Sequence, residues 1–379
     1  MKYSLKRCFA VGVACLGGLP ACQSYLDVTP VSVANVNAFY KTREDAVVAT
    51  NAVYNALQEP HREALWLLGE VLSDNTEDPN LDIDNFAFDA NDGTVTNAWR
   101  YHYLGITRAN TVLNRLPGIR MDESLRNRLM LEARFLRAYF YFNLVRLFGD
   151  VPLVTAEVAG LPDDHPARAS REAVYAQIID DLVAAEALPD AYPSTEAGRA
   201  TRGAALGLLA KVHLTRGEWS LAAVKARAVV ESGTYALLPG YADVFTAAHK
   251  NSRESLFEVQ YFVGAQSGTG NPVSNNFFEL FAPAGSGSAV TGVPNANAFG
   301  RNVPTADVVS AYEPGDRRRE ASLGTSYTQP GNPPREVRVN YTTKYLDASA
   351  TAGGLGTGSS NGWRVLRYAD VLLVYAEAL

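Results

Sequence analysis

The stretch EARFLRAYFYFNLVRLFGDVPL, residues 132–153, decides the fold that this sequence predicts. Through it, and through the residues just before it, apolar side chains recur at spacings of four and three, as in an amphipathic helix. The apolar stripe consists of Leu125, Leu129, Ala133, Leu136, Phe140, Leu144 and Leu147. Arg137 and Arg146 interrupt the apolar run, which therefore predicts a buried helix and not a membrane span. We expect this helix over 122–148, with Gly149 as its C-cap.

Other helical patterns lie on both sides of this stretch. One covers 42–57, one covers 99–116, and one follows the N-cap residue Ser170. A pair of amphipathic helices then covers 201–233 and is joined by the turn Gly217-Glu218-Trp219. This unit of 33 residues is similar to one tetratricopeptide repeat. A single repeat cannot cover its own apolar faces, so we expect the upstream helices to be its neighbours.

The character of the sequence changes after Gly233. Residues 255–262 alternate apolar and polar side chains, which predicts a half-buried strand. Segments 263–300, 326–334 and 353–362 are rich in Gly, Asn, Ser and Pro, and long irregular segments of this kind are often functional. A helical pattern returns at 365–379, with an apolar face of Leu366, Ala369, Leu373 and Ala376. The sequence stops there without a cap, and we interpret it as truncated at its C-terminus.

The first 22 residues have the pattern of an exported lipoprotein. Three basic residues precede a short uncharged segment that ends in Leu19-Pro20-Ala21-Cys22. A leucine three residues before a cysteine and a small residue just before it are typical of the bacterial lipobox. We therefore predict a signal peptide over 1–21 and a lipid on Cys22, with an ordinary secretory signal as the alternative. The other cysteines, Cys8 and Cys15, lie inside the signal, so the mature chain has no disulfide or thiol site.

The charge balance excludes one class of partner. Three of the 34 basic residues lie in the signal segment, which leaves 31 against 40 acidic residues and a net charge of −9 for the mature chain. Nucleic-acid binding requires a basic surface, so we expect no nucleic-acid partner.

Five motifs in order give the chain a family resemblance. They are Tyr25-Leu26-Asp27-Val28-Thr29-Pro30 after Cys22; the helix with Trp99, Tyr103, Ile106, Ala109 and Asn110; the run Glu132–Leu153; the repeat pair Ala204–Leu237; and the run Arg367–Ala378. In these motifs the chain resembles the SusD/RagB outer-membrane nutrient-uptake lipoproteins of Bacteroidetes, over essentially its whole mature length.

The resemblance implies a mainly α fold, in which a tetratricopeptide-like scaffold of helical pairs carries an irregular, loop-rich region with short β-strands. It implies a surface-exposed, lipid-anchored protein of the outer membrane that is not an enzyme. Such a protein binds a polysaccharide, an oligosaccharide or another oligomeric nutrient and delivers it to a SusC-like TonB-dependent transporter. We divide the chain into the signal peptide 1–21, a helical region 22–233 and a loop-rich ligand region 234–379.

Aromatic faces and polar side chains are the groups that bind sugars. Trp99 and Trp363 each adjoin a polar or glycine-rich loop, and Trp66 precedes one, so all three are candidate ligand contacts. Asp74 and Asn75 are further candidates at the start of the acidic segment 73–92. A structural calcium ion there is an alternative, although the spacing fails the EF-hand pattern. We expect no other cofactor and no catalytic residue.

Signals for enzymatic chemistry are thin. Gly358-Ser359-Ser360-Asn361-Gly362 matches the Gly-x-Ser-x-Gly pattern only within a glycine- and serine-rich tract, and no apolar strand precedes it. The five histidines have no metal-ligand spacing, and Arg317-Arg318-Arg319 is interpreted as a solvated turn. Two other functions stay open: an adaptor lipoprotein in outer-membrane assembly, built from regular tetratricopeptide repeats, and a glycan-degrading enzyme with paired carboxylates.

Overall fold

The computed structural model describes residues 39–78, 82–157, 166–264, 273–353 and 358–379. The predicted signal peptide 1–21 and the predicted lipid acceptor Cys22 lie outside these residues, and both stay predictions.

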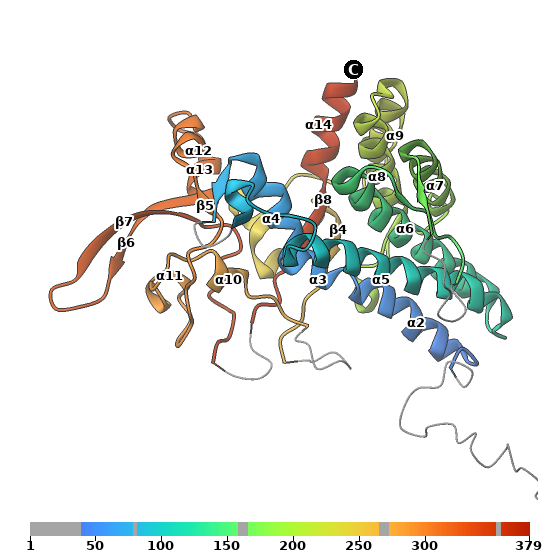
Figure 1. Cartoon of the computed structure of the whole chain (residues 1–379), viewed down its shortest axis with the longest axis horizontal. Helices are drawn as coiled ribbons and strands as arrows, with labels where there is room; N and C mark the ends of the chain where they lie inside the picture. Colours follow the sequence, from blue (N-terminus) through green and yellow to red (C-terminus); the bar gives the residue numbers. More distant parts are fainter. Residues whose placement is uncertain (1–38, 79–81, 158–165, 265–272, 354–357) are drawn as a thin grey trace, which may run out of the picture.

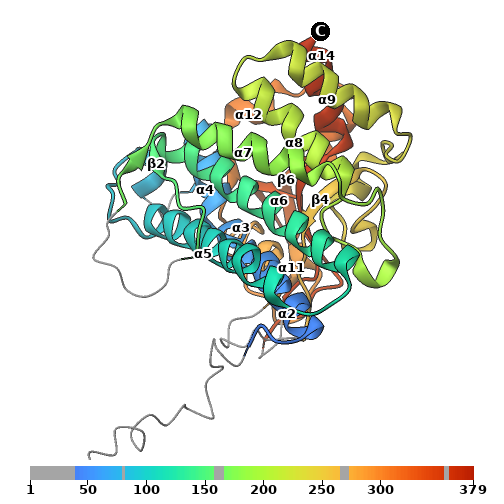
Figure 2. The ribbon, with the colours of Figure 1, turned by 90° about the vertical axis from the view of Figure 1, so that its right-hand side faces the viewer.

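A stack of long helices forms one side of the molecule (Figures 1 and 2). The helices are α2 (Arg43–Asn55), α5 (Gly93–Arg115), α6 (Glu123–Phe148), α7 (Arg171–Ala185), α8 (Arg202–Thr215), α9 (Trp219–Glu231) and α14 (Tyr368–Ala378). Each of them packs against the next one named. The predicted scaffold of stacked helical pairs is confirmed.

The predicted helix ends are set by short-range hydrogen bonds. The Asp122 carboxylate accepts from the Leu125 backbone N–H at 2.8 Å and begins α6, and Gly149 ends it with a φ of 71°. Helix α5 begins at Gly93, earlier than the predicted residue 99. The reason is Asp92, whose carboxylate accepts from the Thr94 backbone N–H at 2.7 Å and so caps the helix.

Short helices and two-stranded sheets form the other side. The short α-helices are α3 (Gln58–Arg62), α4 (Ala64–Glu70), α10 (Phe277–Leu280), α11 (Ser288–Thr291), α12 (Ala306–Ala311) and α13 (Arg317–Ser322). The 3-10 turns are η2 (Val71–Ser73), η3 (Asp82–Asn85), η4 (Leu116–Gly118), η5 (Ser194–Glu196), η6 (Tyr241–Phe245) and η7 (Ala247–His249).

All the strand pairs in the described part of the chain are antiparallel. They are β1 (Thr76–Glu77) with β5 (Val303–Pro304), β2 (Val151–Pro152) with β3 (Arg168–Ala169), β4 (Ser255–Val259) with β8 (Trp363–Arg367), and β6 (Leu323–Gln329) with β7 (Arg335–Thr342). The β6–β7 hairpin projects from the body of the protein (Figure 1).

Three predictions about the second half are wrong. The predicted strand at 255–262 exists as β4, but it is not half-buried, because the polar Glu258 is buried beside Arg364. Segment 326–334, predicted as a loop, belongs largely to the β6–β7 hairpin. Both hairpin strands expose side chains on both faces, so their sequence shows no apolar period.

The third wrong prediction concerns the helix over 365–379. Residues 363–367 form strand β8, and the helix α14 begins only at Tyr368. Its buried residues are Val371 and Val374, whereas Leu373 is 69% exposed.

One continuous core joins the two halves. The Phe135 ring on α6 lies 4.9 Å from the Phe257 ring on β4, and α14 packs on α8 and α9. The core therefore crosses the predicted division at residue 233, and that division stays a prediction. None of the described helices is both long enough and apolar enough to cross a membrane.

Candidate functional site

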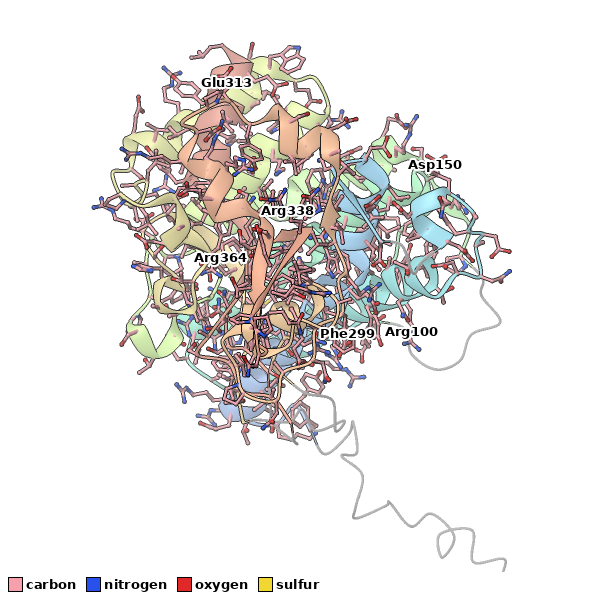
Figure 3. All side chains as sticks on the ribbon, turned by 90° about the vertical axis from the view of Figure 1, so that its left-hand side faces the viewer. Arg100, Asp150, Phe299, Glu313, Arg338 and Arg364 are labelled. Carbon is pink, nitrogen blue, oxygen red and sulfur yellow. The ribbon has the colours of Figure 1, made fainter. Side chains whose placement is uncertain are left out.

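A pocket of about 470 Å³ lies where α12, α13 and the base of the β6–β7 hairpin meet the end of α4, β1 and the start of β8. Figure 3 views this side of the molecule, with Arg338 on the hairpin and Glu313 between α12 and α13. The volume is in the range of small-ligand sites in proteins. Its polar and aromatic lining consists of Glu70, Asn75, Thr76, Tyr241, Phe281, Asn302, Tyr312, Asp316, Arg318, Ser322, Thr342, Lys344, Tyr345 and Trp363.

Two stacked aromatic rings contribute to the wall of the pocket. The rings of Tyr345 and Trp363 lie 5.0 Å apart and are nearly parallel, at 5°. Phe277 contacts Trp363 at 5.2 Å between ring centroids. Tyr345 has a φ of 66°, an uncommon backbone conformation for a residue with a side chain. The structure holds this strained residue because its ring is buried in the aromatic cluster, and strain of this kind gathers at functional sites.

A buried polar network holds the strand that carries Trp363. Arg364 donates to the Asn361 side chain and to the Thr246 carbonyl, and its Nε lies 3.5 Å from the Glu258 carboxylate. Asn361 in turn donates to the Phe245 carbonyl at 2.6 Å. These hydrogen bonds tie Asn361 and Arg364, on the two sides of Trp363, to the backbone at Phe245 and Thr246.

Ser359 belongs to the same network. It is fully buried, donates to the Asp347 carboxylate at 2.5 Å, and accepts from the Asn361 backbone N–H at 2.9 Å. Ser359 is therefore a structural hydroxyl, whereas the serine of the Gly-x-Ser-x-Gly match at 358–362 is its neighbour Ser360, which is partly buried.

Charged and amide groups also line the pocket. Arg318 and Asp316 form an ion pair with Nη2 and Oδ2 2.6 Å apart, and hydrogen bonds from Arg318 lower the pKa of Asp316. The Lys344 Nζ lies 4.9 Å from the centroid of the Phe245 ring. The Asn302 Oδ1 accepts from the Thr76 hydroxyl at 2.7 Å, which orients the amide. Burial raises the pKa of Tyr345 to about 12, so its hydroxyl stays neutral.

This lining suits a polar ligand that also has apolar faces. Flat rings offer stacking surfaces, and amide, guanidinium, ammonium and hydroxyl groups offer hydrogen bonds of both senses.

Two of the residues predicted as ligand contacts, Asn75 and Trp363, line this pocket. Asp74 lies beside it, where the Asp74 carbonyl accepts from the Thr305 hydroxyl at 3.0 Å. Ligand contact by any of these residues stays a prediction.

The other two candidate tryptophans, Trp66 and Trp99, do not line this pocket. The Trp66 side chain is 1% exposed and packs against Phe281, so the core covers its ring, and ligand contact by Trp66 stays a prediction. The reason is that α4 turns its apolar face inward. Trp99 is partly exposed on α5, where it packs against Tyr103 and Phe148 and does not line the pocket.

Most residues that line the pocket around Trp363 are not marked by any motif in the sequence. Tyr241, Tyr312, Lys344 and Tyr345 come from segments without a motif. Arg318 was interpreted as part of a solvated turn, whereas residues 317–322 form α13 and Arg318 lines the pocket. The signal that could have found it is the Asp316 carboxylate, which accepts from the Arg318 backbone N–H as an N-cap.

The acidic segment 73–92 has structural roles. Asp78 forms a buried ion pair with Arg301, with Oδ2 and Nε 2.7 Å apart, and Asp92 caps α5. Across the described ranges, no group of three or more His, Cys, Asp or Glu side chains is arranged to hold a metal ion. A calcium ion in this segment stays a prediction without further support.

A stack of helical pairs that carries a polar and aromatic pocket on its loop-rich side defines a helical-scaffold ligand-binding protein. Residues 24–214 match the family model described as starch-binding and associating with the outer membrane, and residues 319–379 match the model of the SusD family. The chain belongs to the SusD family, and the predicted SusD/RagB identity from Bacteroidetes is confirmed.

Curated relatives agree with this assignment. The SusD-like protein P2 of Formosa agariphila is 29% identical, over 94% of this chain and 74% of the relative. The starch-binding protein SusD of Bacteroides thetaiotaomicron is 28% identical, over 54% of this chain and 36% of that protein.

Solved structures agree as well. A laminarin-binding SusD-like protein superimposes with a TM-score of 0.77 at 26% identity and covers 89% of this chain and 80% of its own. A structure with a xylogluco-oligosaccharide superimposes with a TM-score of 0.74 at 25% identity and covers 88% of this chain and 70% of its own.

Proposed function

We propose that this protein binds a neutral oligosaccharide or polysaccharide in the pocket around Trp363. The observation that carries the proposal is the stacked Tyr345–Trp363 pair, which lines a pocket of about 470 Å³ together with Asn302, Arg318 and Lys344. The relatives named for starch and laminarin support the ligand class.

The second part of the proposal is delivery. We infer that the protein is held to the outer membrane by a lipid on Cys22 and passes its ligand to a SusC-like TonB-dependent transporter. Family membership supports the outer membrane, because the matched model is described as associating with it.

The proposed role is binding without catalysis. Two carboxylates line the pocket, those of Glu70 and Asp316, and Asp316 is paired with Arg318. Glycoside hydrolysis needs two carboxyl groups that flank one bond, one of them ready to donate a proton. An Asp316 with a lowered pKa is a poor proton donor. The strands and loops of the second half also argue against an adaptor made of regular repeats throughout.

Calorimetric titration of the purified protein tests ligand binding. The probes are laminarihexaose and a xylogluco-oligosaccharide, the ligands in the names of related structures. Tyr312→Ala removes an aromatic lining residue and weakens binding about three- to ten-fold. The matched control is Tyr327→Ala on the hairpin, outside the pocket, which leaves the affinity unchanged. Equal affinities for both variants would reject the pocket.

Three further measurements test the lipid anchor, the transporter partner and the absence of catalysis. Cys22→Ser abolishes incorporation of labelled palmitate, and the wild-type lipoprotein co-purifies with a transporter from outer membranes. Sugar products released during prolonged incubation with the probes would contradict a purely binding role.

A further inference from the structure

A second pocket, of about 410 Å³, lies between α2, the segment 195–199 and the end of β4. It shares no lining residue with the pocket around Trp363. Its lining consists of Asn51, Tyr54, Asn55, Leu57, Gln58, Thr195, Glu196, Ala197, Gly198, Arg199, Glu258, Gln260, Phe262 and Val273. The β4–β8 ribbon links the two pockets, because β8 supplies Trp363 to one, and β4 with the residues after it supplies Glu258 and Gln260 to the other.

A glycine allows segments distant in the sequence to form this pocket. Gly198 has a φ of 91°, and a Cβ atom there would lie 2.6 Å from the Gln260 Cδ. Only glycine fits this close approach in this backbone conformation. Segment 195–199 can therefore lie against the end of β4 and form a wall of the pocket.

The pocket has one well-exposed aromatic side chain. Phe262 is 55% exposed, and the Lys250 Nζ lies 5.1 Å from its ring centroid. Lys250 is itself held, because its Nζ donates to the Tyr261 carbonyl at 2.9 Å. A large apolar ring exposed at a polar pocket is a stacking surface for the C–H face of a sugar.

Carboxamide side chains line the pocket and are held by hydrogen bonds within the protein. Asn55 donates to the Gln58 Oε1 at 2.9 Å, and Gln58 donates to the backbone carbonyl of Gln260 at 2.8 Å. The Gln260 carboxamide is held by the Asn251 side chain, to which it donates at 2.9 Å. The Asn51 Oδ1 accepts from the Arg199 Nη2 at 3.0 Å. An amide group can make about four hydrogen bonds. Asn51 is exposed, so its side chain keeps bonding capacity for sugar hydroxyls.

Every charge in this lining is paired within the protein. Arg128 donates to both oxygens of Glu196 at 2.8 Å. Arg199 donates to Glu132 at 2.8 Å, and Glu258 lies 3.5 Å from Arg364. The described lining thus offers no unpaired charge to an ionic ligand, whose own charge would be buried there without a partner.

We propose that this second pocket is an additional binding site for a neutral saccharide, formed by the Phe262 ring and the carboxamides of Asn51, Asn55 and Gln260. The saccharide class of the ligand rests on the proposed function, whereas the site is separate from the pocket around Trp363. Two sites on one protein would hold a polysaccharide at two points, which slows its dissociation.

Fluorine NMR with one reporter in each pocket tests the proposal. 4-Fluorophenylalanine is placed at position 262 in one sample and at position 312 in another, and each is titrated with laminarihexaose and with a xylogluco-oligosaccharide. We expect both signals to shift with saturable curves. In calorimetric titrations of the unlabelled protein, we expect Phe262→Ala to weaken the second site alone by about three- to ten-fold. Trp219→Ala, which removes a similarly exposed aromatic residue on α9, is the matched control and leaves both curves unchanged.

The outcomes separate the two proposals. A shift at position 312 alone overturns the second site and leaves the proposed function standing. A shift at position 262 alone supports the second site and overturns the pocket around Trp363 as the ligand site. No shift at either position overturns both. Binding of an oligogalacturonate at position 262 as tight as that of the neutral probes overturns the neutral ligand class.

Discussion

Arg137 on α6 binds Asp181 on α7 through two parallel hydrogen bonds, from Nε to Oδ2 and from Nη2 to Oδ1, both 2.7 Å long. Both side chains are buried. The Arg137 Nη1 also donates to the Asn110 Oδ1 on α5 at 2.8 Å. The Arg137 guanidinium therefore joins three consecutive helices of the scaffold. Arg137 and Asn110 both belong to the motifs that give the family resemblance.

Replacing Arg137 with alanine should lower the free energy of unfolding by about 3–5 kcal/mol, because the buried Asp181 carboxylate loses both short hydrogen bonds and keeps only Arg134, 3.5 Å away. Urea unfolding measures the change. The control is Arg202→Ala, which breaks a solvent-exposed pair with Asp190 and should cost less than about 1 kcal/mol. An equal decrease in the free energy of unfolding for both variants would show that the buried ion pair stabilises the protein no more than the exposed one.

Gly105→Ala should destabilise the protein by about 1–3 kcal/mol through overpacking. A Cβ at Gly105 on α5 would lie 2.3 Å from the Phe140 ring on α6. Gly69→Ala is the matched helical control, since a Cβ there meets nothing within 4 Å, and it should be neutral or stabilising by up to about 1 kcal/mol. Thermal unfolding compares the melting temperatures of the two variants. A decrease for Gly105→Ala alone shows that the close packing of α5 on α6 requires glycine, because both variants lose the same backbone flexibility.

The free energy of unfolding should decrease as the pH is lowered below about 6.5, the ordinary pKa of histidine. Burial lowers the pKa of His61 to about 3, and it lowers the pKa of His102 to about 4. The unfolded chain binds a proton at each near pH 6.5, whereas the folded protein does not. The stabilisation is therefore complete above pH 6.5 and is lost toward pH 3–4, at up to about 1.4 kcal/mol per pH unit and histidine.

Urea unfolding at pH 7 and pH 5 measures this slope. His61→Gln removes one titrating group and should reduce the slope by about half within that window. An unchanged slope in the variant would mean that His61 is protonated in the folded protein.

Ser359→Ala should lower stability by about 1–3 kcal/mol, because the buried Asp347 carboxylate loses a donor. Ser349→Ala is the closest control, since Ser349 donates to the same carboxylate at 2.5 Å but is exposed, and it should cost about 0.5 kcal/mol. Chemical denaturation of both variants compares the two donors. Similar losses would contradict a special role of burial at Ser359.

Much of the helical scaffold could be predicted because its signals are local. The stripe from Leu125 to Phe140 and the caps Asp122 and Gly149 specify α6 without knowledge of its neighbours. The β6–β7 hairpin had no such signal, since its strands expose both faces and lack an apolar period. The segment around Leu366 was predicted as helix because apolar residues there match helical spacing by chance, while pairing with β4 makes it a strand.

The residues of the two pockets likewise differ in whether a local sequence signal marks them. Trp363 and Asn75 were recognisable as aromatic and polar residues beside loops, but the sequence could not separate them from Trp66, whose ring the core covers. Phe262 had no signal at all, because its pocket depends on Gly198 and the segment around it.

The sequence by itself determined the family, the helical stack and the net charge, because these depend on local periodicity, on short motifs and on composition. Only the tertiary structure decided which side chains share a pocket. Tyr345 and Trp363 lie 18 positions apart in the chain, and Asn51 and Arg199 lie 148 positions apart. Such contacts depend on how separate segments pack against one another, and no local pattern of residues encodes that packing.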